Sequence, residues 1–156
     1  MNKPSHISAD GTISMVDVSG KGASARHARA EARLTMNPAA RAALREATLP
    51  KGDAFVAAQL AGIMAAKATA SLIPLAHPVP LAQVDVRFEW TDDGVRIESE
   101  ARTVGQTGVE MEAMVAASIA ALTLYDMTKA LDKGIAIESV RLLEKSGGKS
   151  GAWKRQ

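Results

Sequence analysis

The sequence predicts an α+β fold, in which helices cover an antiparallel sheet. Three observations support this: segments that alternate between apolar and polar residues, an Asp-Asp-Gly turn between two of them, and two long segments that are apolar around most of a helix. The chain has 156 residues, so we expect a single domain over residues 1–156.

The first half of the chain predicts one strand and two helices. Residues 27–36 (HARAEARLTM) alternate as a half-buried strand does. Asn37 and the proline after it are typical of a helix start, and this short helix should run to about residue 47. Asp53 caps a longer helix over residues 54–73. The apolar side of the strand consists of Ala28, Ala30, Ala32, Leu34 and Met36.

The second half begins with a loop that three prolines stiffen, residues 72–81 (LIPLAHPVPL). Residues 82–90 (AQVDVRFEW) alternate again, residues 92–94 form a hairpin turn, and residues 95–102 return as the partner strand. The expected core side of the first of these strands is Ala82, Val84, Val86, Phe88 and Trp90.

A glycine loop at residues 103–108 precedes the longest helix, which should end near residues 132–134. Residues 135–144 (IAIESVRLLE) are the last predicted strand. Residues 1–14 should form a mobile arm and residues 145–156 a flexible tail rich in glycine and lysine.

The main elements therefore run β-α-β-β-α-β, with the short helix as an insertion. This is the ferredoxin-like order, an antiparallel sheet with two helices on one face. Both long helices are apolar nearly all round, and one sheet face cannot bury that much surface. We therefore expect a homo-oligomer.

Composition excludes several kinds of site. Without cysteine there is neither a disulfide nor a thiolate metal site, and the three histidines lack zinc-ligand spacing. The polar start of the chain lacks a signal peptide, and no uncharged run reaches membrane-spanning length, so we expect a cytoplasmic protein. The net charge is only +2, but basic residues cluster at 21–33 and 141–155, which favours a polyanionic ligand.

Asp126 and Lys129 follow a long uncharged run and share one face of the longest helix. An acid and an amine beside an apolar wall are typical of proton-transfer sites. An exposed ion pair at a helix end explains the same spacing.

Three further segments are candidates with alternatives. His77, between prolines, is either a ligand or proton carrier or a loop histidine bonded to backbone. The acids of the first helical turn, Glu110 and Glu112, either serve the helix dipole or belong to a ligand-binding helix start. The tail SGGKSG resembles the end of a P-loop. Leu143 replaces the first glycine and too few residues follow for the helix, so a P-loop NTPase is excluded, although Lys149 can reach a phosphate.

Met111 and Asp126 lie 15 residues apart on one helix, roughly 22 Å at 1.5 Å per residue. One small-molecule site cannot use both ends of that helix within a single chain. Either one end is functional, or two subunits share the site.

Five segments together resemble the cyclic pyranopterin monophosphate synthase family, the molybdenum cofactor biosynthesis protein C family. They are MVDVSGK, KGD, AGIMAAKATASLIPLAHPVPL, TGVEMEAMVAASIAALTLYDMTKA and VRLLEKSGGKSG. The resemblance covers residues 6–152. It implies a ferredoxin-like subunit in a homohexamer, a trimer of dimers, with active sites at subunit interfaces.

The implied enzyme is a lyase that converts 3′,8-cyclo-7,8-dihydroguanosine triphosphate into cyclic pyranopterin monophosphate and pyrophosphate. No cofactor is required by the sequence, and Mg²⁺ on the substrate triphosphate is compatible with it. The implied partners exclude nucleic acid and membrane. By resemblance Asp126 and Lys129 are catalytic, and the substrate-binding residues are Leu75, Ala76, His77, Met111, Glu112, Lys51, Lys67, Arg26, Lys145 and Lys149.

Within this resemblance we expect Lys129 to have a lowered pKa in a partly apolar pocket, to act as general acid and base, and to be oriented by Asp126. Ala76 stands where the family motif usually has cysteine, so the chemistry does not need that thiol if this protein is active. The alternatives are an inactive homologue and a nucleotide- or RNA-binding ferredoxin-like module.

Overall fold

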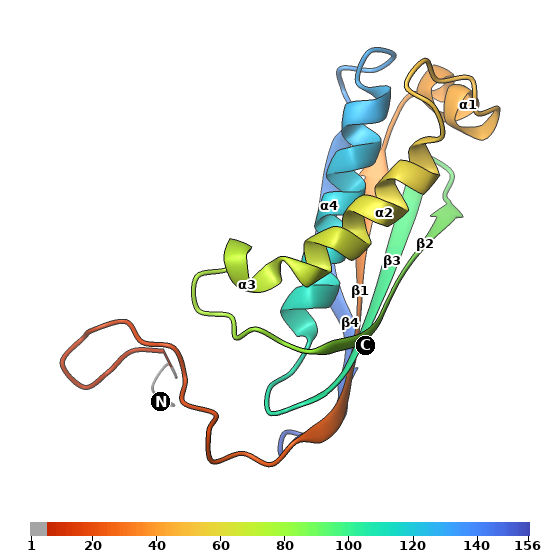
Figure 1. The fold of residues 1–156 in the computed structure, drawn as a ribbon. Helices are drawn as coiled ribbons and strands as arrows, with labels where there is room; N and C mark the ends of the chain where they lie inside the picture. The colour runs from red at the N-terminus through yellow and green to blue at the C-terminus, as the bar shows by residue number, and fades with distance from the viewer. Residues whose placement is uncertain (1–5) are drawn as a thin grey trace.

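The computed structural model describes residues 6–156 and has the predicted order of elements (Figure 1). The first five residues of the predicted arm lie outside the described part of the chain. The elements are β1 Ser24–Thr35, α1 Pro38–Arg45, α2 Ala54–Lys67, α3 Thr69–Leu72, β2 Leu81–Trp90, β3 Gly94–Gly105, α4 Glu110–Thr128, β4 Ala136–Ser146 and β5 Trp153–Lys154.

The strands form one antiparallel sheet in the order β2-β3-β1-β4-β5. β1 lies at its centre, paired with β3 on one side and β4 on the other. α2 and α4 lie side by side across one face (Figure 1). The α+β class is confirmed, and the arrangement fits the ferredoxin-like order.

The core lies between the sheet and the two long helices. The apolar side of β1 is buried as predicted, because side chains two apart share a face of a strand. Small residues let α2 and α4 approach closely. A Cβ added at Gly62 would lie 3.0 Å from both the Ala116 carbonyl oxygen and Val86 Cγ2.

Two predicted helices end earlier than the sequence indicated. The helix predicted over residues 54–73 breaks at Ala68, whose N–H is shared between the carbonyls of Met64 and Ala65, so that the short α3 follows separately. The longest helix ends at Thr128. Beyond it the Asp132 carboxylate accepts hydrogen bonds from the backbone N–H groups of Asn37 and Gly134, which holds the chain in a turn.

The alternation predicted for β2 fails at its first residues. The pairing with β3 shifts register between Leu81 and Gln83, and Leu81 packs against the core whereas Ala82 is exposed. An extra residue in a strand inverts the alternation before it. From Val84 onward the predicted side faces the core.

The two ends of the chain carry more backbone pairing than predicted. Within the arm Ile7 bridges to Ile13. Lys145, placed by the sequence in the tail, is part of β4, and it pairs with Trp153 of β5. Over residues 6–156 no helix has both the length and the apolar character needed to cross a membrane.

Candidate active site

One cavity collects most of the predicted substrate-contacting residues. Its volume is about 560 Å³, and it lies where the arm, the proline loop, the start of α4 and the end of β4 meet. Of the predicted residues, it is lined by Leu75, Ala76, His77, Met111, Glu112 and Lys145. Two stretches far apart in the sequence, residues 75–77 and 111–112, therefore share one cavity.

His77 connects this cavity to the segment between the arm and β1. Its Nε2 lies 2.6 Å from the backbone carbonyl oxygen of Val16. A carbonyl can only accept, so this contact places a proton on Nε2. Nδ1 is left to accept a hydrogen bond or take up a proton. The structure thus shows the hydrogen bond to backbone that was expected of a loop histidine. It also places the ring in the cavity, as a ligand or proton carrier requires.

The start of α4 supplies two carboxylates with different surroundings. Glu110 Oε1 lies 2.8 Å from Lys145 Nζ, so this acid is paired with a cation from β4. Glu112 is only 4% exposed, and burial raises its pKa, with a smaller contribution from the Glu110 charge. The cavity therefore has one acid paired with a cation and one acid whose protonated form burial favours.

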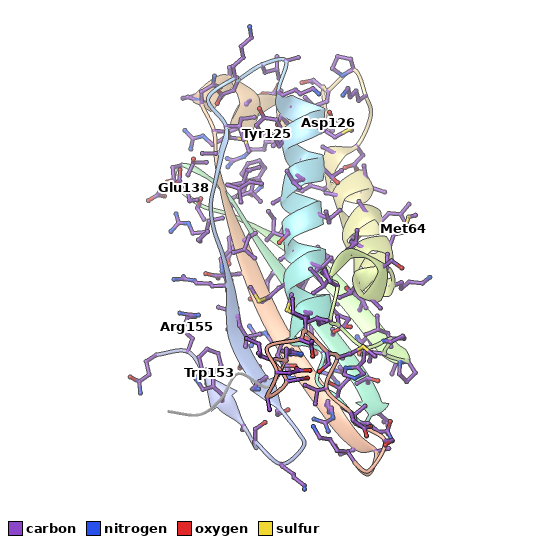
Figure 2. The ribbon with its side chains drawn as sticks, turned by 90° about the vertical axis from the view of Figure 1, so that its left-hand side faces the viewer. Met64, Tyr125, Asp126, Glu138, Trp153 and Arg155 are labelled. Carbon is purple, nitrogen blue, oxygen red and sulfur yellow. The ribbon has the colours of Figure 1, made fainter. Side chains whose placement is uncertain are left out.

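Asp126 and Lys129 lie at the opposite end of α4, as Figure 2 shows for Asp126. Asp126 Oδ1 is 2.7 Å from Lys129 Nζ, and its Oδ2 is 3.1 Å from Lys51 Nζ. Lys51 also donates to the Asp126 carbonyl oxygen at 3.1 Å. The predicted shared face of Asp126 and Lys129 is confirmed, and Lys51, predicted only as a substrate contact, joins that pair.

The protonation expected for Lys129 is wrong for the described chain. Its side chain is 53% exposed, and its hydrogen bond to Asp126 raises the pKa of the amine rather than lowering it. The pKa of Asp126 is lowered, chiefly by Lys129 and then by Lys51.

The remaining predicted cations lie elsewhere. Arg26 and Lys149 line a second cavity, which adjoins the first through Lys21. Lys67, the last residue of α2, is exposed and lines neither of these cavities. In residues 6–156 no group of three or more His, Cys, Asp or Glu side chains could hold a metal ion.

Some lining residues were missed from the sequence. Lys21 belonged to the basic cluster at 21–33 and ended the segment MVDVSGK, but it was not predicted to contact the substrate. Glu110 was recognised only as a helix-start acid. Val16 and Val18, which follow the arm, have apolar side chains that carry no chemical signal, and His6 of the arm also lines the cavity.

The aromatic residues of β2 argue against RNA binding on the sheet. Phe88 and Trp90 pack against the core, and the Phe55 ring of α2 lies 4.9 Å from Phe88 and 5.6 Å from Trp90 between ring centroids. RNA-binding sheets of this kind stack bases on exposed aromatics. These rings lie on the face that the helices cover.

Comparison with known proteins agrees with this arrangement. The sequence profile of a family described as the MoaC family matches residues 15–148. A cyclic pyranopterin monophosphate synthase of Novosphingobium aromaticivorans is 51% identical over 154 residues, 99% of this chain and 98% of that protein. Proteins of the same name from two strains of Corynebacterium glutamicum are 51% identical over 156 residues, all of both chains.

Proposed function

Because the chain belongs to the MoaC family, we propose that it is a cyclic pyranopterin monophosphate synthase, a lyase of molybdenum cofactor biosynthesis. The substrate is 3′,8-cyclo-7,8-dihydroguanosine triphosphate, and pyrophosphate is released. The full-length identity to proteins of that name carries the proposal. The shared cavity of residues 75–77 and 111–112 supports it, since these are the stretches that the resemblance assigns to substrate.

Closing the cyclic phosphate needs both a proton acceptor and cations. A ribose hydroxyl oxygen attacks the α-phosphorus, its proton passes to a base, and the bond from the α-phosphorus to the bridging oxygen breaks as pyrophosphate leaves. Negative charge spreads over the phosphates in this step, so nearby cations lower its barrier. Arg26, Lys145 and Lys149 are the cations that the two adjoining cavities provide.

Rearranging the base needs a proton donor for a departing ring nitrogen. Lys129 enters as an ammonium ion, because Asp126 raises its pKa, and in that form it is a general acid. Asp126 fixes the direction of the amine, and Lys51 neutralises the second oxygen of the same carboxylate. After donating its proton, Lys129 is the base that the hydroxyl needs.

The proposal includes a homohexamer built as a trimer of dimers, with each site shared between subunits. Asp126 and the cavity at Met111 lie roughly 22 Å apart along α4, too far for one small substrate to reach both. Val56, Leu60 and Met64 are each about 60% exposed along one side of α2. Figure 2 shows Met64 pointing away from the sheet. A second copy covering that side would bring another chain's groups to the site.

The test is turnover of the cyclised dihydro-GTP by the purified protein, followed as pyrophosphate and as the fluorescent oxidised pterin. Lys129→Ala should abolish turnover while the oligomer, measured by light scattering, stays intact. Arg87→Ala, at the exposed edge of the sheet, is the matched control and should retain activity. Full activity in Lys129→Ala would contradict the catalytic role. If the folded wild-type protein shows no turnover, the proposed activity is contradicted and the protein is an inactive homologue.

A further inference from the structure

Two hydroxyl groups are buried on the side of β3 that faces the helices. Ser99 and Thr103 are 0% and 2% exposed, and Ala101 lies between them on the same side, because side chains two apart share a face of a strand. A buried hydroxyl is unfavourable unless it forms a hydrogen bond, and an apolar side chain would fill such a position without that cost. The partners of the two hydroxyls therefore indicate their role.

Ser99 holds the start of α4. Its Oγ donates to the Ala113 carbonyl oxygen at 2.5 Å and lies 3.4 Å from that of Ala30. In a regular helix the Ala113 carbonyl already accepts from the N–H four residues later, so α4 does not need this second bond. Ala113 follows Met111 and Glu112, which line the cavity, so the bond fixes how far this wall lies from β3.

Thr103 holds the proline loop. Its Oγ1 donates to the Pro80 carbonyl oxygen at 2.7 Å. His77 lies three residues before Pro80 and is followed by Pro78, and the fixed φ angles of the two prolines stiffen this connection. Anchoring Pro80 therefore limits where the His77 ring can lie in the cavity.

The core beneath these two walls is small. Its buried residues are Ala28, Ala30, Ala101, Val109 and Ala113. Val79 of the proline loop packs against it. Alanine buries little apolar surface, so packing holds the walls less strongly here than in the main core. The two hydrogen bonds are therefore a larger part of what keeps the walls in place.

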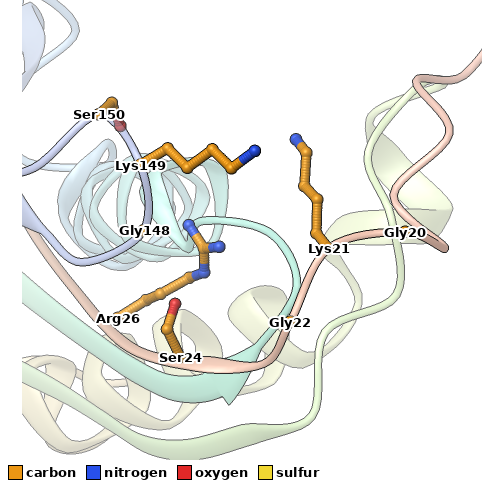
Figure 3. Close-up of a pocket in the computed structure, with 8 residues that line it drawn as sticks. All are labelled: Gly20, Lys21, Gly22, Ser24, Arg26, Gly148, Lys149 and Ser150. Carbon is orange, nitrogen blue, oxygen red and sulfur yellow. The ribbon is translucent and has the colours of Figure 1, made fainter.

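β3 is a firm base for both bonds. It is paired with β1 on one side and β2 on the other. Beyond Thr103, Arg26 Nε donates to the Gly105 carbonyl oxygen at 2.9 Å, and one terminal nitrogen of the same guanidinium donates to that of Gln106 at 3.0 Å. Figure 3 shows this guanidinium beside Gly148. The strand that carries both hydroxyls is thus held along its length and at its end.

We propose that Ser99 and Thr103 are positioning residues for the substrate. From one strand they set the separation of residues 75–77 from residues 111–112, the two walls of the cavity. Neither side chain is among the described residues that line the cavity, so each acts through the wall that it holds. Without its bond a wall must be ordered when the substrate binds, so the loss appears in KM rather than in kcat. This inference rests on the proposed function.

The first experiment measures backbone hydrogen exchange of the full-length protein by mass spectrometry, which does not depend on activity. Thr103→Val, which keeps the shape of the side chain, should speed exchange in residues 72–79 about fivefold, the scale of one neutral hydrogen bond. Ser99→Ala should speed exchange in residues 109–116 and leave the proline loop unchanged. Thr35→Val is the matched control, since its hydroxyl bonds to Glu138 at the other end of β1. Faster exchange throughout the chain in Thr103→Val would show general destabilisation and overturn the inference.

The same variants are then assayed for turnover. Thr103→Val should raise KM about fivefold with kcat nearly unchanged. Thr103→Ser, which restores the hydroxyl, should return both KM and loop exchange to wild-type values. An unchanged KM in active Thr103→Val and Ser99→Ala proteins would overturn the inference and leave the proposed function standing. The expected exchange pattern in a protein without turnover would contradict the proposed function and keep the anchoring of the two walls by β3.

Discussion

Single residues in this chain are tuned by what lies within hydrogen-bonding distance. Each carboxylate oxygen of Asp126 is paired with one lysine. Glu112 is buried, and no cation contributes to the shift of its pKa. The pKa of the first carboxyl is lowered and that of the second is raised. Two acids at opposite ends of one helix thus favour opposite protonation states.

The raised pKa of Glu112 predicts a pH dependence of stability. The folded protein keeps this proton to higher pH than the unfolded chain, whose value is near 4.5. The free energy of unfolding should therefore fall as pH rises from about that value through the folded pKa. Glu112→Gln should lack this fall, and should be more stable relative to wild type at pH 7 than at pH 4. Urea unfolding at both pH values tests this, with the exposed Glu46→Gln as control. The same stability difference between Glu112→Gln and wild type at both pH values would contradict it.

Lys145 belongs to the same cavity and predicts a kinetic effect. Its amine is paired with Glu110 at 2.8 Å, and both side chains are about 30% exposed, so the pair adds little to stability. Lys145→Ala should fold normally and raise KM about tenfold, the cost of one charge-assisted contact to phosphate. Steady-state kinetics measures this, with Lys133→Ala as a lysine outside both cavities. An unchanged KM and kcat would remove Lys145 from the site.

At the scale of elements, the packing of α2 on α4 depends on side-chain size. Gly62 approaches α4 closely, although glycine costs a helix about 1 kcal/mol relative to alanine. The exposed side of α2 shows the reverse arrangement, with large apolar residues turned away from the sheet. One helix therefore has a small-residue face for the core and a large-residue face for another surface.

Gly62→Ala should destabilise the fold. The added Cβ meets a carbonyl oxygen and Val86 at 3.0 Å, and overpacking of this kind typically costs 1–3 kcal/mol, which outweighs the gain in helix propensity. We expect a net loss of about 1 kcal/mol in the free energy of unfolding, measured by urea titration. If Gly62→Ala is more stable than wild type, α2 and α4 can move slightly apart without lowering the free energy of unfolding.

Period-two patterns predicted the sheet well because they depend only on neighbouring residues. The buried side of β1 follows directly from its alternating sequence. The break at Ala68 and the bulge at Leu81 have no comparable local signal, since they arise from shared hydrogen bonds and from pairing with β3. The contact of Lys51 with Asp126 joins residues 75 positions apart, so only the folded chain brings them together.

At the scale of the whole molecule, the predicted functional residues other than Lys67 fall into two groups at opposite ends of α4. The family resemblance identified both groups. The spacing along the helix did not decide whether only one end is functional or two subunits share the site. The described chain keeps the groups apart and leaves an apolar side of α2 exposed. The proposed activity therefore predicts that copies of the chain assemble.

Placing a charge on that side should separate the subunits. Leu60 is 58% exposed in the chain, so Leu60→Glu should leave the fold intact while opposing burial against another copy. We expect a smaller particle in light scattering and at least a hundredfold loss of turnover, with native circular dichroism. Arg87→Glu, at the sheet edge, is the control. An unchanged oligomer would show that α2 does not form the contact between subunits.

The two-residue strand β5 has a consequence for the lysine that precedes it. Trp153 and Lys154 pair with β4, and Arg155 donates to the carbonyl oxygens of Leu143 and Leu142. These bonds close the intervening segment into a short ring anchored at both ends, so its chain entropy is lost before any ligand arrives. Lys149 therefore stays close to Arg26, at a higher effective concentration than a flexible chain end would give it. A tag fused behind Gln156 would extend the chain directly from this anchor.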